Sequence, residues 1–293
     1  MTTMTEPTTR TLEAPGATIT YDVRETDSRA PVLVLIGSPM GAGGFVTLAS
    51  HFPDRTVVTY DPRGVERSVK ADPASQSTPE QHADDLHRIL DELGSGPVDL
   101  FASSGGAVNA LALVAAHPEQ VRTLVAHEPP LAALLSDREG ALAVTEAIAD
   151  TYQRSGFGPA MAQFIAVVSY TGRMTPEFAA QPAPDPAMFG LPTEDDGGRT
   201  DPLLFQNIIT CTHYEPDFEA LKRASTTIVL GAGLESEGEM ANRGAHAVAE
   251  RLGQEVVPFP SHHGGFLGGE YGWGGDPDAF ALKLREVLEE NGG

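Results

Sequence analysis

The sequence predicts an α/β protein in which a mostly parallel, doubly wound sheet carries an inserted helical segment. First, short apolar runs bounded by Pro or Gly alternate with helical segments over residues 31–128. This alternation is typical of buried parallel strands joined by crossover helices. Second, the pattern stops at Pro129 and Pro130 and resumes at residues 226–233, so the segment between them interrupts the sheet.

Each expected element has a local reason. Residues 11–25 alternate loosely, which favours a β-hairpin. Thr78 is expected to begin a helix, because Pro79 suits its first position and Gln81 completes a capping box. The buried strands are expected at residues 32–36, 56–60, 97–103, 121–128, 226–233 and 254–260. Helices are expected at residues 43–51, about 78–93, 105–117, about 239–252 and 276–290.

The inserted segment has a different character. Residues 131–175 carry apolar residues at helical spacing, whereas residues 176–202 contain six prolines and an acidic, glycine-rich run. A short, very apolar helix follows. We therefore expect a core domain made of residues 1–130 and 216–293, with a helical cap formed by residues 131–215.

Size and charge limit the classes of function. The 293 residues are 41% hydrophobic, enough for one large domain with an insertion. The net charge of −22 repels phosphate backbones and anionic lipid, so we expect neither nucleic-acid nor membrane partners. The single cysteine, Cys211, excludes an internal disulfide and a cysteine-based metal site. With no signal-peptide pattern and no apolar run of membrane-spanning length, we expect a cytoplasmic protein, and a homo-oligomer stays open.

The stretch "DLFASSGGAVNALAL" has two adjacent serines between a strand and a helix. A serine at the tip of such a sharp turn exposes its hydroxyl, and the residues two before and two after it must be small. Around Ser104 these neighbours are Ala102 and Gly106, whereas Ser103 would have the bulky Phe101. Ser104 is therefore the candidate nucleophile. The alternative is a plain connector in which this serine caps the helix.

A nucleophilic serine needs hydrogen-bond donors for the oxyanion that forms on its substrate. The backbone N–H of Gly105 is one candidate. The loop "GSPMGAGGF" after the first buried strand offers a second, the N–H of Ser38, although it could also be an ordinary glycine-rich turn. That loop lacks the lysine of a phosphate-binding loop, and no dinucleotide fingerprint follows a strand, so no cofactor is expected.

These motifs together resemble the α/β-hydrolase superfamily over nearly the whole chain. The resemblance is carried by "VLVLIGSPMG", by "YDPRGVERS", which is similar to the family's D-x-R-G-x-G-x-S loop, by "ASSGG" and by the late "SHHGGF". Glu66 replaces the second glycine of that loop, and Ile36 stands where a histidine is common. The resemblance implies a serine nucleophile, an acid and a histidine in that chain order, as in esterases and cofactor-free haloperoxidases.

The candidate base lies in the loop after the last strand, which holds His262 and His263. We favour His263, because Gly264 and Gly265 leave room around it and "HGGF" resembles the family's usual context. His262 is the alternative. A metal site built from this pair is not expected, because adjacent residues on extended backbone point in opposite directions.

The acid departs from the common pattern of the family. Its usual place, after the strand that follows the cap, here holds Ser236, flanked by Glu235 and Glu237. Glu128 instead closes the strand before the cap, at the sheet edge where the nucleophile is expected, and its position resembles the subset of the family whose acid sits there. We favour Glu128 over Glu235, with Glu237 third. The alternative is a structural Glu128 that binds loop amides.

The sequence therefore predicts a serine hydrolase that acts through Ser104, His263 and Glu128 on a small, neutral, apolar ester, lactone or related acyl compound, with no metal. Part of the apolar cap could line its pocket. The candidates are Met161, Phe164, Leu203, Leu204, Phe205, Ile208 and Ile209. A haloperoxidase-like perhydrolase and a non-catalytic protein that binds small ligands remain alternatives, because the fold also hosts both.

Overall fold

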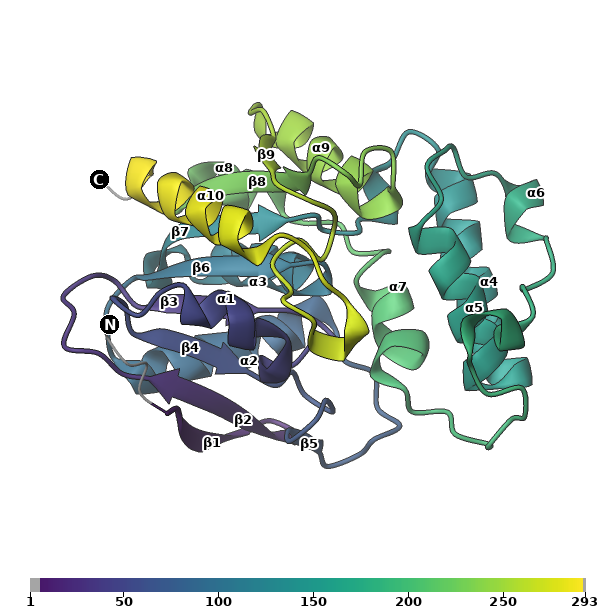
Figure 1. The fold of residues 1–293 in the computed structure, drawn as a ribbon, viewed down its shortest axis with the longest axis horizontal. Coiled ribbons are helices and arrows are strands. Elements are labelled where there is room, and N and C mark those ends of the chain that lie inside the picture. The colour runs from purple at the N-terminus through teal and green to yellow at the C-terminus, as the bar shows by residue number, and fades with distance from the viewer. Residues whose placement is uncertain (1–5, 292–293) are drawn as a thin grey trace.

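A nine-stranded sheet runs through the protein, as the computed structural model of residues 6–291 shows (Figure 1). The strand order is β1-β2-β4-β3-β6-β7-β8-β9, and β5 pairs with β2. The strands are β1 (Thr8–Ala14), β2 (Ala17–Arg24), β3 (Leu33–Ile36), β4 (Val57–Tyr60), β5 (Val69–Lys70), β6 (Val98–Ser103), β7 (Val121–His127), β8 (Thr227–Gly233) and β9 (Val257–Phe259). Pairing is parallel from β4 through β3 to β9 and antiparallel around β2. The predicted doubly wound, mostly parallel sheet is confirmed, and β5 is an addition.

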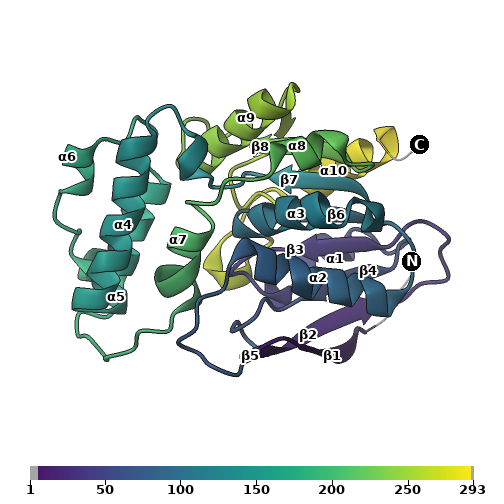
Figure 2. The same cartoon turned by 180° about the vertical axis from the view of Figure 1, so that it is seen from behind.

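Helices cover both faces of this sheet (Figures 1 and 2). On one face α1 (Val46–Ser50) and α10 (Pro277–Glu290) pack against Phe101 of β6. On the other, α2 (Pro79–Leu93), α3 (Gly105–Ala116), α8 (Phe218–Arg223) and α9 (Met240–Leu252) pack against Leu100 of the same strand. Short 3₁₀ turns lie at η1 (Ala42–Phe45), η2 (Pro118–Gln120) and η6 (Glu270–Gly272). The predicted capping box at Thr78 is present, and no helix within residues 6–291 is long and apolar enough to cross a bilayer.

The segment predicted as a cap lies beyond one end of the sheet, on the right of Figure 1. It contains η3 (Ala132–Leu134), α4 (Arg138–Ser155), α5 (Phe157–Val168), α6 (Pro176–Ala179), η4 (Pro186–Phe189), a π-helical turn η5 (Pro202–Asn207) and α7 (Ile208–Thr210). These elements share their own apolar cluster. Arg243 of α9 joins them to the core, because its guanidinium donates to Asp137 and to the carbonyl of Gly172.

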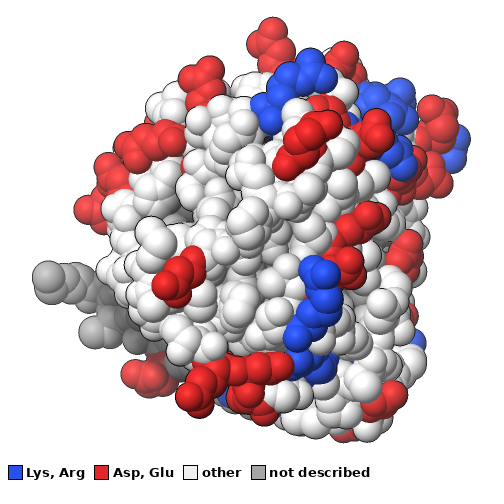
Figure 3. Space-filling model, turned by 90° about the vertical axis from the view of Figure 1, so that its right-hand side faces the viewer, with Lys and Arg blue, Asp and Glu red and all other residues white. Residues whose placement is uncertain are grey.

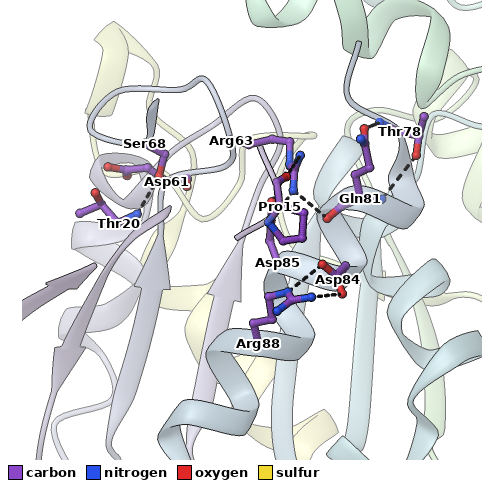
Figure 4. A network of polar contacts seen from close by, with 10 residues as sticks. All are labelled: Pro15, Thr20, Asp61, Arg63, Ser68, Thr78, Gln81, Asp84, Asp85 and Arg88. Atoms are coloured by element: carbon purple, nitrogen blue, oxygen red, sulfur yellow. Dashed lines mark hydrogen bonds and ion pairs between the residues drawn. The ribbon is translucent and has the colours of Figure 1, made fainter. Parts of the chain in front are cut away.

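The loop between β4 and β5 is fixed by buried polar contacts (Figure 4). Ser68 accepts a hydrogen bond from the Thr20 backbone N–H at 2.8 Å and donates to the Asp61 carbonyl at 2.6 Å. Arg63 forms a two-pronged ion pair with Asp85 of α2, at 2.6 and 2.8 Å. These contacts hold the loop that follows β4 against β2 and α2.

Candidate active site

Ser104 lies at the tip of a strained turn between β6 and α3. Its φ of 57° and ψ of −129° are unusual for a residue with a side chain. Its backbone N–H donates to the carbonyl of His127 at 2.9 Å, and its carbonyl accepts from Ala107 at 2.9 Å. The neighbouring Ser103 is only 3% exposed, whereas Ser104 is partly exposed. The turn therefore presents Ser104 rather than Ser103.

Close packing explains the small residues on either side of this turn. A Cβ added at Gly106 would lie 2.7 Å from the Cα of Gly37, closer than side chains approach. Ala102 is fully buried between β3 and β7, where it pairs with Ile36 and Ala126. A larger residue at Gly106 would therefore push α3 away from the loop after β3.

The loop after β3 packs directly on the start of α3. A Cβ added at Gly105 would lie 2.5 Å from the carbonyl oxygen of Ser38. Gly105 is the first residue of α3, so no group within that helix can accept its N–H. The loop is anchored further along, where the N–H of Ala42 donates to Asp61 at 2.8 Å. The two predicted oxyanion donors thus lie on backbone segments in contact.

Asn207, which the sequence reasoning missed, reaches this loop from the segment after α5. Its side-chain amide donates to the hydroxyl of Ser38 at 2.7 Å, and both residues are buried. A polar side chain within the apolar stretch "LLFQNIITC" was the available signal.

The structure brings Glu128 and His263 together at the same edge of the sheet. Glu128 follows β7, and its Oε2 lies 2.5 Å from Nδ1 of His263, which follows β9. The carboxyl is completely buried, whereas the imidazole side chain is 36% exposed. Because Ser103 pairs with His127 in the sheet, Ser104 and Glu128 are the next residues on two adjacent parallel strands.

The electrostatics of this pair favour its charged form. Burial alone would raise the pKa of Glu128, but hydrogen bonds from His263 and Ser236 and the nearby imidazoles lower that pKa to about 2. Burial likewise opposes the charge on His263, yet the hydrogen bond and negative charge of Glu128 raise the pKa of the imidazole above its ordinary value. A positive charge on this ring is therefore stabilised by its partner.

The residues considered as alternatives for the base and the acid make other contacts. His262 accepts from the Gly264 N–H at 3.1 Å and contacts the Gly274 carbonyl at 3.2 Å, so its ring braces the glycine-rich loop. Glu235 and Glu237 are exposed on the turn after β8. Within residues 6–291, Glu128 is the carboxylate with a hydrogen bond to His263.

A second buried histidine lies behind the pair. His127 is fully buried, its two ring nitrogens have no partner within residues 6–291, and its ring packs against Phe259 and Phe280. Ligand-type atoms of His127, Glu128 and His263 lie within 4.8 Å of one another. The 2.5 Å contact is a hydrogen-bond distance, however, and two ligands of one tetrahedral zinc ion stand roughly 3.3 Å apart. The arrangement therefore suits proton transfer better than metal binding.

The glycine-rich loop lies over the start of η1. Tyr271 donates from its hydroxyl to Glu66 at 2.8 Å, and a Cβ added at Gly43 would lie 3.3 Å from that hydroxyl. Trp273 is 55% exposed. Glu66, where the sequence departs from the family pattern, thus ties this loop to the loop after β4.

Comparison with known proteins identifies the family to which the fold belongs. The family model described as the alpha/beta hydrolase fold matches residues 30–206, more than half of the chain. The chain belongs to the α/β-hydrolase family. It is 33% identical over 262 residues to the uncharacterized hydrolase YraK of Bacillus subtilis strain 168, covering 87% of this chain and 89% of YraK.

Solved structures of this family have the same fold. A thermophilic esterase from Thermogutta terrifontis superposes with a TM-score of 0.64 at 20% identity, covering 98% of this chain and 99% of the esterase. The enol-lactonase from Burkholderia xenovorans LB400 gives a TM-score of 0.65 at 17% identity, covering 96% of this chain and all of the enol-lactonase (100%). At these sequence identities, the solved structures show a shared fold and nothing more. The family of hydrolases is assigned from the family model and from YraK.

Proposed function

We propose that this α/β hydrolase is a serine hydrolase that cleaves a small, neutral acyl compound through Ser104, His263 and Glu128. The observation that carries the proposal is the 2.5 Å contact between the buried Glu128 and His263, made beside the strand that ends in the Ser104 turn. A base oriented by a buried carboxylate is the arrangement that activates a serine hydroxyl.

In the first half of the proposed reaction, the Oγ of Ser104 attacks the carbonyl carbon of the substrate. Nε2 of His263 takes the serine proton, and Glu128 stabilises the resulting imidazolium while it holds the productive tautomer. The oxyanion is held by the backbone N–H groups of Gly105 and Ser38. His263 then gives its proton to the leaving oxygen, which departs as an alcohol, or stays attached by its far end when the substrate is a lactone.

In the second half, water attacks the acyl-enzyme. His263 takes a proton from the water, the same N–H groups hold the second oxyanion, and collapse of that intermediate returns the proton to Ser104. The product is a carboxylic acid. The negative field of the whole chain, whose net charge is −22, favours release of this anion.

The proposed substrate class follows from the apolar surface that the segment beyond the sheet edge offers. Leu204 and Ile208 of the segment beyond the sheet edge are buried, whereas Met161, Phe164 and Phe205 are partly exposed and offer apolar surface. The centre of the face on this side of the molecule is largely uncharged, with acidic side chains and several basic ones around it (Figure 3). A neutral ester or lactone suits such surroundings better than an anion, and the esterase and the enol-lactonase act on these two classes. By the same charge argument, we propose no nucleic-acid or membrane partner.

The test is labelling followed by turnover. A fluorophosphonate probe is expected to modify Ser104, with the mass shift on the peptide of residues 99–113, and Ser104→Ala is expected to abolish labelling and hydrolysis. Ser103→Ala is the matched control, because it removes a hydroxyl next door and is expected to keep most activity. p-Nitrophenyl esters of increasing chain length and a lactone panel then define the substrate. Label on Ser103, or turnover by Ser104→Ala, would overturn the proposal.

Two readouts, perhydrolysis and probe labelling, separate the two other functions that the fold hosts. Perhydrolysis of acetate with hydrogen peroxide, faster than ester cleavage, would identify a perhydrolase. A folded protein whose Ser104 fails to react with the probe would indicate a ligand-binding protein.

A further inference from the structure

A buried cradle holds the oxygen of Glu128 that faces away from His263. The Gly233 N–H donates to Oε1 at 2.8 Å, the hydroxyl of Ser236 makes a short hydrogen bond to the same oxygen, and the side-chain amide of Asn242 donates to it at 3.3 Å. Ser236 is 0% exposed and Asn242 4% exposed. We infer that Ser236 and Asn242 are positioning residues that act on the reaction through Glu128, an inference that rests on the proposed function.

The two oxygens of the Glu128 carboxylate have different partners. Donors from the end of β8, from the turn after it and from α9 all bind Oε1, so Oε2 is left for Nδ1 of His263. A glutamate reaches its carboxylate through three rotatable bonds, and burial removes water that could otherwise hold it. The donors therefore fix the plane of the carboxylate, and with it the orientation of the imidazole.

The same geometry explains why a serine occupies position 236. Its hydroxyl lies against the carboxylate of Glu128, so an aspartate there would press a second buried negative charge against the first. The serine hydroxyl donates a hydrogen bond to Glu128, whereas a carboxylate at this position would repel it. The residue at the family's usual acid position thus supports the acid at its other position.

Asn242 has the weaker part in the cradle. Its amide is shared between Glu128 at 3.3 Å, the Gly233 carbonyl at 3.1 Å and the Ser236 hydroxyl at 3.5 Å. We therefore expect loss of the Ser236 hydroxyl to affect catalysis more than loss of the Asn242 amide.

The experiment is a double-mutant cycle measured with a p-nitrophenyl ester. Ser236→Ala is expected to lower kcat about tenfold with KM unchanged, because a charge-assisted hydrogen bond is lost. In the Glu128→Gln background the same substitution is expected to change kcat less than twofold, because the Ser236 hydroxyl then binds a neutral amide that cannot stabilise the imidazolium. The far-downfield proton resonance of the His263 Nδ1–H should shift in Ser236→Ala. Ser77→Ala, which removes a fully buried hydroxyl without a partner in residues 6–291, is the control with unchanged kcat.

If Ser236→Ala does not fold, Asn242→Ala tests the same inference. It is expected to lower kcat by less than Ser236→Ala, and this loss should again disappear in the Glu128→Gln background. Wild-type kcat in a folded Ser236→Ala, or an equal loss in both backgrounds, would overturn the inference. If Glu128→Gln itself keeps full activity, the proposed function fails instead. If Glu128→Gln loses activity but Ser236→Ala keeps wild-type kcat, the positioning role of Ser236 is refuted and the proposed function stands.

Discussion

The substitution Glu128→Gln tests the proposed acid most directly, because the amide has nearly the shape of the carboxylate. In the variant, the amide oxygen at Oε1 can still accept from Gly233 and Ser236, so the fold should survive. The amide nitrogen then faces Nδ1 of His263 and donates to it. Nδ1 must become the acceptor, so Nε2 carries the proton and cannot take one from Ser104.

The size of the effect follows from the lost charge. Two unit charges about 4 Å apart interact by about 4 kcal/mol at an effective dielectric constant of about 20. The 2.5 Å contact between Oε2 and Nδ1 brings this pair at least that close. We therefore expect kcat to fall by roughly 1,000-fold, with the wrong tautomer adding to the loss.

The assay is kcat across a pH series, with Glu235→Gln as the matched control. That residue is exposed, and its substitution removes the same charge from the same sheet edge. In the wild type, activity should rise with pH as His263 loses its proton, with a midpoint above the usual imidazole value because Glu128 raises this pKa. In Glu128→Gln the midpoint of any residual activity should move to lower pH. A kcat within threefold of wild type, or an equal loss in Glu235→Gln, would refute the assignment.

Three further predictions concern stability. Burial lowers the pKa of His82 to about 3 and of His127 to about 4, so in acid the unfolded chain binds protons that the folded protein does not. Stability should therefore fall as pH drops below about 6.5, by about 2 kcal/mol per ring at pH 5, and His127→Phe should flatten this slope in urea titrations at pH 7 and 5. Arg243→Gln should lower the free energy of unfolding by about 2 kcal/mol and expose residues 131–215 to protease, because Asp137 loses its ion pair, although the Met174 N–H still donates to it; unchanged cleavage would contradict this. Asp99→Asn should cost about 3 kcal/mol by thermal or urea unfolding, because two arginines share this buried carboxylate, while kcat of the folded variant stays normal.

Much of the fold could be predicted because its signals are local. Pro and Gly bound each apolar run, and the capping box at Thr78 marks a helix start within four residues. β5 escaped prediction, since two residues show no periodicity and the strand exists through its pairing with Ala17 and Thr18 of β2. Local patterns therefore reveal the elements but not the short strands that only distant pairing creates.

The residues of the candidate site that follow parallel strands can be predicted from the order of the strands. Parallel strands end at one edge of the sheet, so Ser104, Glu128 and His263 could be assigned to that edge from their places in the sequence. The roles of Asn207 and Asn242 could not, because each is a neutral side chain whose partner is more than 100 residues away, and the apolar stretch around Asn207 does not name that partner. Donors of this kind become visible only when the buried acceptors are known.

Backbone strain marks the same region without reference to residue type. In the part of the chain that the structure describes, five residues other than glycine have positive φ: Glu66, Ser104, Glu128, Ser261 and Tyr271. Ser104 and Glu128 follow adjacent strands, and Ser261 stands two residues before His263. Glu66 and Tyr271 are hydrogen-bonded to each other over the start of η1. Such conformations cost about 1–3 kcal/mol each and persist where the surrounding structure enforces them, typically at functional sites. That strain gathers at the carboxyl edge of this sheet is therefore an argument for the site that is independent of the chemistry of its side chains.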